Sequence, residues 1–325
     1  MTSDVPKNPP TPPITPVFIG GCPRSGTTFL ASVLGTGPGC VVTPESTFKN
    51  SLWRASGGGR KALETASTGK LLERQFRYRL WGLPPAEQFL PDGSQGMAEI
   101  LQSLVAEYAK QKEEPDPRFW IDHTPRNLRH AFALLKVFPQ ARFIHIVRDG
   151  RAVASSVKHL DWGPNTVAAA ARWWCRRLGE GVLAEGYLAD YAAVHRVRYE
   201  DLVTNPDKTL ATLSNHVFGS GDGIELTGIG QAMDLPEYTR GQHQLIGKDP
   251  DPSRAEAWRK KLSPEDIEEF EFIAGGVLEH LGYKTECPAP KGPSTGKKVR
   301  RNLSESWRGM VNSIRRRSRR QLPIQ

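Results

Sequence analysis

The chain has 325 residues, of which 38% are hydrophobic, and a formal net charge of +9. This length allows one large α/β domain or two smaller ones. Residues 297–325 contain ten of the 44 Lys and Arg and one of the 35 acidic residues, which leaves 34 of each in 1–296. Because the whole excess of positive charge lies in this tail, the body is not expected to carry a basic nucleic-acid-binding face. We therefore expect no specific nucleic-acid partner.

The cysteines and the N-terminal composition indicate a cellular location. Cys22, Cys40, Cys175 and Cys287 are widely spaced and form no C-x-x-C pair, which predicts reduced thiols rather than a disulfide scaffold or a zinc site. Residues 1–16 hold six prolines among polar residues and predict a disordered lead-in, not a signal peptide. No apolar run approaches the roughly 20 residues that span a bilayer. We expect a cytoplasmic protein, soluble or peripheral at the inner face of the membrane.

The predicted elements alternate between strands and helices. Short β-branched and aromatic runs predict strands at 17–19, 41–42, 119–122, 142–147 and 194–199. Helices are predicted at 29–34, 61–81, 97–113, 126–138, from 151, at 165–190, and from Pro264 with Ser263 as N-cap and Gly282 at the C-terminal end. This alternation predicts a mainly parallel sheet flanked by helices on both faces, in one domain over 17–286.

The loop at 21–28 has the features of a phosphate cradle. It follows a strand, precedes a helix, and has the Gly21-x4-Gly26 spacing of the P-loop, so we expect a three-layer, P-loop-type fold. Thr27-Thr28 stands where the P-loop has Lys-Ser/Thr, and no obvious Walker-B acid follows a strand. The positive charge lies instead at Arg24. The loop therefore predicts an anionic group that is bound without a metal.

A second anion site is predicted where the strand at 142–147 ends. Arg148 follows a buried strand, where an unpaired charge is costly, and Ser156 lies about two helical turns further on. A guanidinium with a nearby hydroxyl suits a phosphate. The alternative is that Arg148 and Asp149 pair with each other.

Together these segments resemble the sulfotransferases that use 3′-phosphoadenosine 5′-phosphosulfate (PAPS). The run Pro-Arg-Ser-Gly-Thr-Thr at 23–28 resembles their 5′-phosphosulfate loop, and 143–156 resembles their 3′-phosphate segment. The order and spacing are closest to the tyrosylprotein-sulfotransferase-like branch that is common in bacteria. The resemblance covers roughly 17–283. It implies these cofactor-binding residues: Pro23, Arg24, Ser25, Gly26, Thr27, Thr28, Arg148, Ser156, Tyr199 against the adenine, and Arg254 and Lys260 in a last loop.

The resemblance also supplies the catalytic candidates. Arg24 is expected to hold the sulfonate oxygens. Glu45 follows the second strand and matches the glutamate that serves as general base in the tyrosylprotein-type relatives. His123 stands where those relatives usually have a lysine, whereas in the phenol and steroid branch a histidine just before a proline is the base. Glu45 and His123 therefore both qualify as the base. Each also has a structural alternative, as a helix-start carboxylate and a neutral strand-end histidine.

The C-terminal tail predicts an amphipathic helix. One helical stripe contains the apolar residues Leu303, Trp307, Met310, Val311 and Ile314. The segment 315–320 that follows holds five arginines and one serine. A linker at 287–300 is expected to precede the tail at 301–325. The tail predicts either an interfacial helix, with 301–320 on an anionic membrane surface, or a helix docked on the body with a solvated basic end.

The sequence thus predicts a PAPS-dependent sulfotransferase that acts on a hydroxyl-bearing acceptor without a metal. The acceptor classes are a glycan, a lipid-linked molecule, a peptide tyrosine or a small molecule. The main alternative is a Mg²⁺-dependent P-loop kinase or nucleotide hydrolase. A third possibility is a catalytically silent protein that keeps the fold and binds membranes or polyanions.

Overall fold

The computed structural model describes residues 13–114, 116–160, 162–219, 250–292 and 295–319. A five-stranded parallel sheet forms its centre, in the order β2-β5-β1-β6-β7. The strands are β1 (Thr15–Gly21), β2 (Cys40–Thr43), β5 (Phe119–Asp122), β6 (Arg142–Val147) and β7 (Val194–Arg198). The first strand in the chain is therefore the middle strand of the sheet, and its loop lies between the ends of its neighbours.

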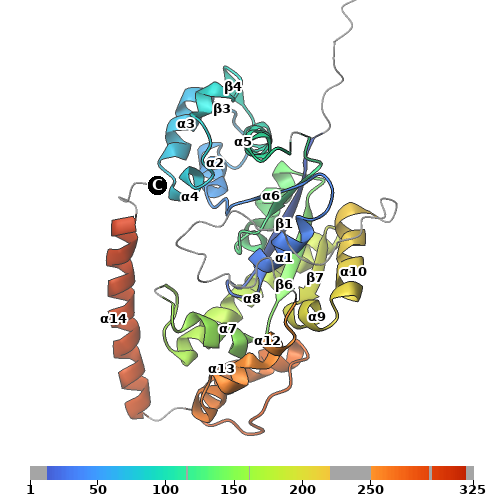
Figure 1. The fold of residues 1–325 in the computed structure, drawn as a ribbon. Coiled ribbons are helices and arrows are strands. Elements are labelled where there is room, and N and C mark those ends of the chain that lie inside the picture. The colour runs from blue at the N-terminus through green and yellow to red at the C-terminus, as the bar shows by residue number, and fades with distance from the viewer. Residues whose placement is uncertain (1–12, 115, 161, 220–249, 293–294, 320–325) are drawn as a thin grey trace, which may run out of the picture.

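The helices lie around this sheet (Figure 1). They are α1 (Thr27–Leu34), α2 (Lys49–Ala55), α3 (Thr65–Glu73), α4 (Phe76–Arg79), α5 (Met97–Gln111), α6 (Ala131–Val137), α7 (Gly150–Val157), α8 (Val167–Ala189), α9 (Tyr199–Thr204), α10 (Pro206–Phe218), α12 (Ser253–Glu256), α13 (Pro264–His280) and α14 (Thr295–Arg319). A small antiparallel ribbon joins β3 (Leu63–Glu64) to β4 (Ser94–Gln95). Single 3₁₀ turns cover Ala86–Gln88, Leu128–His130 and Ala257–Lys260.

Alternating side chains of the strands bury both faces of the sheet. Phe18, Trp120 and Phe143 point to one face and pack with α2, α5 and α6. Val17, Ile19 and their neighbours point to the other face and pack with α1, α9 and α10. A third apolar cluster joins α7, α8 and α13. Because helices cover both faces, the inner strands β5, β1 and β6 are mainly apolar and buried, as in other parallel sheets, whereas the edge strand β7 carries His195, Arg196 and Arg198.

The expected fold is confirmed, with differences in some helices. The strand at 119–122 and the strand at 142–147 have the predicted bounds, and Ser263 caps α13 by accepting a 3.2 Å hydrogen bond from the backbone N–H of Asp266. Residues 126–130 form turns and a 3₁₀ segment, so the helix expected at 126–138 begins only at Ala131. Two further helices, α2 and α10, were not predicted from the sequence.

The C-terminal region differs from the expected linker and tail. Residues 1–12 of the predicted lead-in lie outside the described residues, and β1 already begins at Thr15. The helix α14 begins at Thr295, inside the expected linker 287–300. The start of that linker is also held to the body, because the backbone N–H of Cys287 donates a 2.8 Å hydrogen bond to Glu271.

Candidate active site

The predicted site residues follow the carboxyl ends of neighbouring strands. Glu45 lies beyond β2, His123 beyond β5, the 21–26 loop beyond β1, Arg148 beyond β6 and Tyr199 beyond β7. Parallel strands place all their carboxyl ends at one edge of the sheet, where open α/β sheets bind ligands. The strand order therefore sets the base candidates on one side of the loop and the predicted 3′-phosphate and adenine residues on the other.

The loop has the conformation of an anion cradle. Arg24 and Gly26 adopt positive φ angles of 76° and 102°, and the backbone N–H of Ser25 donates a 3.1 Å hydrogen bond to the carbonyl of Cys22. The N-terminus of α1 lies directly behind this turn. The hydroxyl of Ser25 is buried and has no hydrogen-bond partner among the described residues. A buried hydroxyl in this position is a ready donor to a bound anion.

Replacing Gly26 with alanine is expected to weaken binding of 3′-phosphoadenosine 5′-phosphate (PAP) about tenfold and to destabilise the fold by about 1–3 kcal/mol. A Cβ atom at Gly26 would lie 2.7 Å from Cδ2 of Tyr199, and the φ angle is one that L residues rarely adopt. Calorimetric titration and thermal unfolding measure the two effects. Gly179→Ala is the matched control, because a Cβ atom at Gly179 meets nothing within 4 Å. Parent-like PAP binding in Gly26→Ala would contradict the cradle geometry.

Arg24, Arg148 and Ser156 come together at the loop. The Nε of Arg24 donates a 3.0 Å hydrogen bond to Oγ of Ser156, and Nη1 of Arg148 donates a 3.1 Å hydrogen bond to the carbonyl of Arg24. Burial lowers the pKa of Arg24, and the nearby Arg148 lowers it further. Two guanidinium groups that are held this close favour an anion beside them.

Tyr199 and Arg148 are stacked. The guanidinium carbon of Arg148 lies 3.9 Å from the centroid of the Tyr199 ring, and Nη2 of Arg148 donates a 3.2 Å hydrogen bond to the carbonyl of Arg254. Its Nε is buried without a hydrogen-bond partner among the described residues. The alternative in which Arg148 pairs with Asp149 is wrong, because Asp149 binds Arg151. Arg151 is also paired with Glu271, so it is a buried structural cation.

The last predicted cofactor residues, Arg254 and Lys260, differ in their relation to the site. Arg254 reaches the site through its backbone carbonyl, while its side chain pairs with Asp251 at 3.2 Å. Lys260 is exposed, and no hydrogen bond or ion pair joins it to the other candidates in the described part of the chain. Its role as a cofactor contact stays a prediction.

Glu45 is a partly exposed carboxylate that is held by an arginine. Its Oε2 lies 3.1 Å from Nη2 of Arg77 on α4, and the two side chains are 26% and 32% exposed. This exposure leaves the carboxylate accessible to an acceptor hydroxyl. The ion pair fixes its direction.

His123 is buried against the loop. Its Nδ1 lies 3.5 Å from Oγ1 of Thr28, and its Nε2 is buried without a partner among the described residues. Burial lowers the pKa of His123, although the carboxylates of Glu45 and Asp122 act in the opposite direction. The imidazole is therefore neutral at pH 7, so it can donate or accept a hydrogen bond but does not supply the cationic charge of a lysine.

A buried ion pair joins the chain segment that follows Glu45 to the residue that precedes His123. Lys49 on α2 pairs with Asp122, which immediately precedes His123, and the side chains are 5% and 0% exposed. Nζ of Lys49 also donates a 2.9 Å hydrogen bond to Oδ1 of Asn127. Burial alone would raise the pKa of Asp122, but Lys49 and the hydroxyls of Ser46 and Thr124 outweigh it and hold that pKa at about 2. The carboxyl group of Asp122 is therefore ionised at neutral pH. Burial lowers the pKa of Lys49, whereas the carboxylates of Asp122 and Glu45 act in the opposite direction.

Hydrogen bonds extend this pair into a network between β2 and β5. The hydroxyl of Ser46, next to Glu45, donates to Asp122, and the backbone N–H of Ser46 donates a 2.9 Å hydrogen bond to Oγ1 of Thr124. The hydroxyl of Thr124 in turn donates to Asp122 at 2.7 Å. The segments that carry Glu45 and His123 are thus fixed relative to each other. This network was not predicted from the sequence. Its only signals there are a lysine that directly follows Phe48 and an aspartate at the end of a strand.

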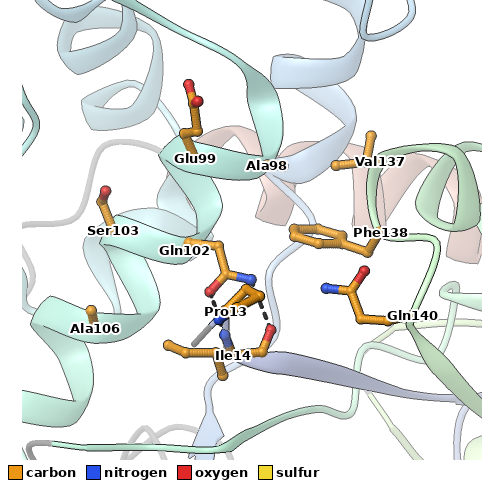
Figure 2. Close-up of a pocket in the computed structure, with 10 residues that line it drawn as sticks. All are labelled: Pro13, Ile14, Ala98, Glu99, Gln102, Ser103, Ala106, Val137, Phe138 and Gln140. Atoms are coloured by element: carbon orange, nitrogen blue, oxygen red, sulfur yellow. Dashed lines mark hydrogen bonds between the residues drawn. The ribbon is translucent and has the colours of Figure 1, made fainter. Parts of the chain in front are cut away.

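A cavity of about 500 Å³ lies away from these residues. Figure 2 shows that it is lined by Ile14 before β1, by Gln102 and its neighbours on α5, and by Phe138 after α6. Gln102 donates to the carbonyl of Ile14 and accepts from its N–H, as the dashed lines in Figure 2 show. Because β1 begins here, the cavity lies at the opposite edge of the sheet from the loop. It is not part of the candidate site.

A parallel α/β sheet with a glycine-bearing loop between its central strand and the following helix defines the P-loop-like class of fold. Within that class, residues 16–217 match the family model described as "Sulfotransferase family", and the chain belongs to this family. It is an enzyme with sulfotransferase activity.

Similar proteins span much of the chain. Protein-tyrosine sulfotransferase 1 of Danio rerio is 25% identical over 294 residues, which cover 84% of this chain and 74% of that protein. An omega-hydroxy-beta-dihydromenaquinone-9 sulfotransferase of Mycobacterium bovis is 36% identical over 188 residues, which cover 51% of this chain and 42% of that protein. The solved sulfotransferase domain from the curacin biosynthetic pathway covers 84% of this chain and 98% of its own, with a TM-score of 0.54 and 17% identity. That likeness confirms the fold.

Two further findings concern the described residues. All four cysteines are unpaired. None of the described helices has the length and apolar character needed to cross a bilayer.

Proposed function

We propose that this enzyme transfers the sulfuryl group of PAPS to a hydroxyl of its acceptor by in-line displacement. The observation that carries the proposal is the row of residues along one sheet edge, with Glu45 and His123 on one side of the loop and Arg148 and Tyr199 on the other. This order matches a ligand with a sulfated 5′-phosphate at the loop and a 3′-phosphate and adenine further along.

The side chains present fit PAPS. The loop N–H groups and the unpartnered hydroxyl of Ser25 suit the 5′-phosphosulfate. Arg148, whose Nε has no partner among the described residues, together with Ser156 suits the 3′-phosphate, and the Tyr199 ring suits the adenine. When bound, PAPS supplies the sulfuryl group and departs as PAP.

The chain's own residues then have distinct roles. Glu45 is the general base that takes the proton of the acceptor hydroxyl, because its carboxylate is accessible whereas His123 is buried against the loop. Neutral His123 donates a hydrogen bond from Nε2 to the bridging oxygen of the leaving phosphate, with Nδ1 accepting from Thr28. Arg24 stabilises the sulfonate oxygens. These groups supply the positioning and charge that the transfer requires, so we propose that it needs no metal.

The acceptor and the cellular location belong to the same proposal. Relatives named for sulfation of protein tyrosine and of an omega-hydroxy-dihydromenaquinone support a hydroxyl acceptor, which includes peptide, lipid-linked, glycan and small-molecule hydroxyls. The four unpaired thiols support a reducing cytoplasm.

Titration with PAP in the presence of EDTA tests the donor. We expect metal-free binding that requires the 3′-phosphate, so that AMP binds much more weakly, and a loss of about 100-fold in affinity in Arg148→Ala, since a charge-assisted contact is removed. Lys260→Ala, an exposed basic residue near the same segment, shows whether Lys260 contributes as well. Binding of ATP only with Mg²⁺, and none of PAP, would replace this proposal with the kinase alternative.

A further inference from the structure

The helix α14 is held to the body by its polar face. Oε1 of Glu305 accepts hydrogen bonds from the backbone N–H and the hydroxyl of Thr166, at 2.9 Å and 2.7 Å, and Nη1 of Arg301 lies 3.2 Å from Glu269. Thr166 is the N-cap of α8, so the carboxylate of Glu305 also lies at the positive end of that helix dipole. Figure 1 shows α14 as a red helix along one side of the molecule.

The opposite face of α14 is apolar and exposed. The exposed fractions of its side chains are 68% for Leu303, 66% for Trp307, 49% for Met310 and 59% for Ile314. Val299 continues this exposed apolar stripe. The other face of α14 consists of partly buried positions, which are 301, 304, 305, 308, 311 and 312. A surface helix normally turns its apolar stripe toward the core. This helix does the reverse.

In the sequence, basic residues lie on either side of the central segment of α14. From 302 to 314 every exposed side chain is uncharged, because the two charged residues of this segment, Glu305 and Arg308, lie on the face toward the body. Four basic residues at 297–301 precede the segment, and five arginines at 315–320 follow it. The sequence therefore carries an apolar stripe with a tryptophan between two basic groups.

We propose that the exposed face of α14 docks the enzyme on an anionic lipid membrane, with the helix lying in the plane of the interface. An apolar stripe that contains a tryptophan suits the boundary between headgroups and acyl chains, and the basic ends suit anionic headgroups. A second copy of this chain is a poorer occupant, because the pairing of two such stripes brings two strongly basic helices together. Since Glu305 fixes the other face to the body, α14 attaches the whole enzyme to the membrane.

Sedimentation of the full chain with vesicles tests this proposal. We expect binding to phosphatidylcholine vesicles that contain phosphatidylglycerol, much weaker binding to phosphatidylcholine alone, and a loss of about tenfold or more in partitioning for the double variant Leu303→Ser, Trp307→Ser. The matched control is Leu183→Ser, because Leu183 is an exposed leucine, 78% accessible, on α8. Brominated lipid should quench tryptophan fluorescence in the parent and less in Trp307→Phe.

Three outcomes would overturn the membrane proposal. They are equal binding to both kinds of vesicle, unchanged binding by the double variant, and a dimer in sedimentation equilibrium that the double variant dissociates while no vesicles are bound. Binding of heparin without binding of vesicles would likewise indicate a polyanion in place of a membrane. PAP titration of the same variants keeps this test independent of the proposed catalytic function, since α14 contributes none of the proposed cofactor residues.

Discussion

Replacing Lys49 with methionine is expected to lower the free energy of unfolding by about 3–5 kcal/mol, because the carboxylate of Asp122 then loses its cation while fully buried. Urea unfolding followed by tryptophan fluorescence measures the change. The double variant Lys49→Met, Asp122→Asn is expected to recover much of the loss, since no charge is then buried and an amide can keep the hydrogen bonds of Ser46 and Thr124.

Acid unfolding provides the control on Asp122 itself. Its pKa is about 2 in the folded chain, below the roughly 3.9 of an unfolded aspartate. Its stabilising contribution is therefore complete above about pH 4 and is lost as the pH falls from there toward 2. Asp122→Asn should flatten the pH dependence of stability in that window. A Lys49→Met variant as stable as the parent, with an unchanged acid transition, would show that the pair contributes nothing.

Replacing Glu45 with glutamine is expected to reduce kcat for sulfation by about 100- to 10,000-fold, because the amide cannot take the proton of the acceptor. PAP affinity should stay within about twofold of the parent, since Glu45 lies on the acceptor side of the loop. The measurement is transfer of labelled sulfate from PAPS to an acceptor identified by screening. Glu180→Gln is the control, because Glu180 is a carboxylate of similar exposure, 24%, that pairs with Arg177.

The alternative assignment, in which His123 is the general base, predicts a different result in the same assay. If His123 takes the proton, His123→Gln abolishes transfer while Glu45→Gln retains it. Under the present assignment, His123→Gln lowers kcat and also weakens PAP binding, since its ring lies against Thr28 of the loop. The pair of variants therefore separates the two roles that the sequence left open.

The sequence predicted those parts of the site that depend on local patterns. The loop, Glu45, His123, Arg148 and Tyr199 each follow a strand, and the carboxyl ends of parallel strands lie at one edge, so alternation of strands and helices was enough to bring them together. The network around Lys49 was not predictable in this way. Lys49 and Asp122 are far apart in the chain and meet only because β2 lies beside β5 in the sheet.

The tail shows a second limit of sequence patterns. Periodicity predicted a stripe on α14, of which Leu303, Trp307, Met310 and Ile314 are exposed, whereas Val311 is partly buried on the face toward the body.

Periodicity could not tell which face of α14 would meet the body, because that depends on where Thr166 and Glu269 lie. A contact that depends on the three-dimensional fold also explains why the predicted alternative, an ion pair between Arg148 and Asp149, is wrong. Adjacent opposite charges can pair, but Arg151 reaches Asp149 from the first turn of the following helix and also binds Glu271.

The central position of β1 affects how the chain folds as it is synthesised. Gly21, which opens the phosphate loop, is in register with Ile146 of β6, and Phe18 is in register with Asp122 of β5. During synthesis β1 therefore has neither of these neighbours until about a hundred further residues have emerged. During that interval its apolar side chains have no sheet to enter, and exposed apolar strands of this kind favour aggregation. The loop after β1 is therefore fixed between β5 and β6 late, although it is synthesised before either of these strands.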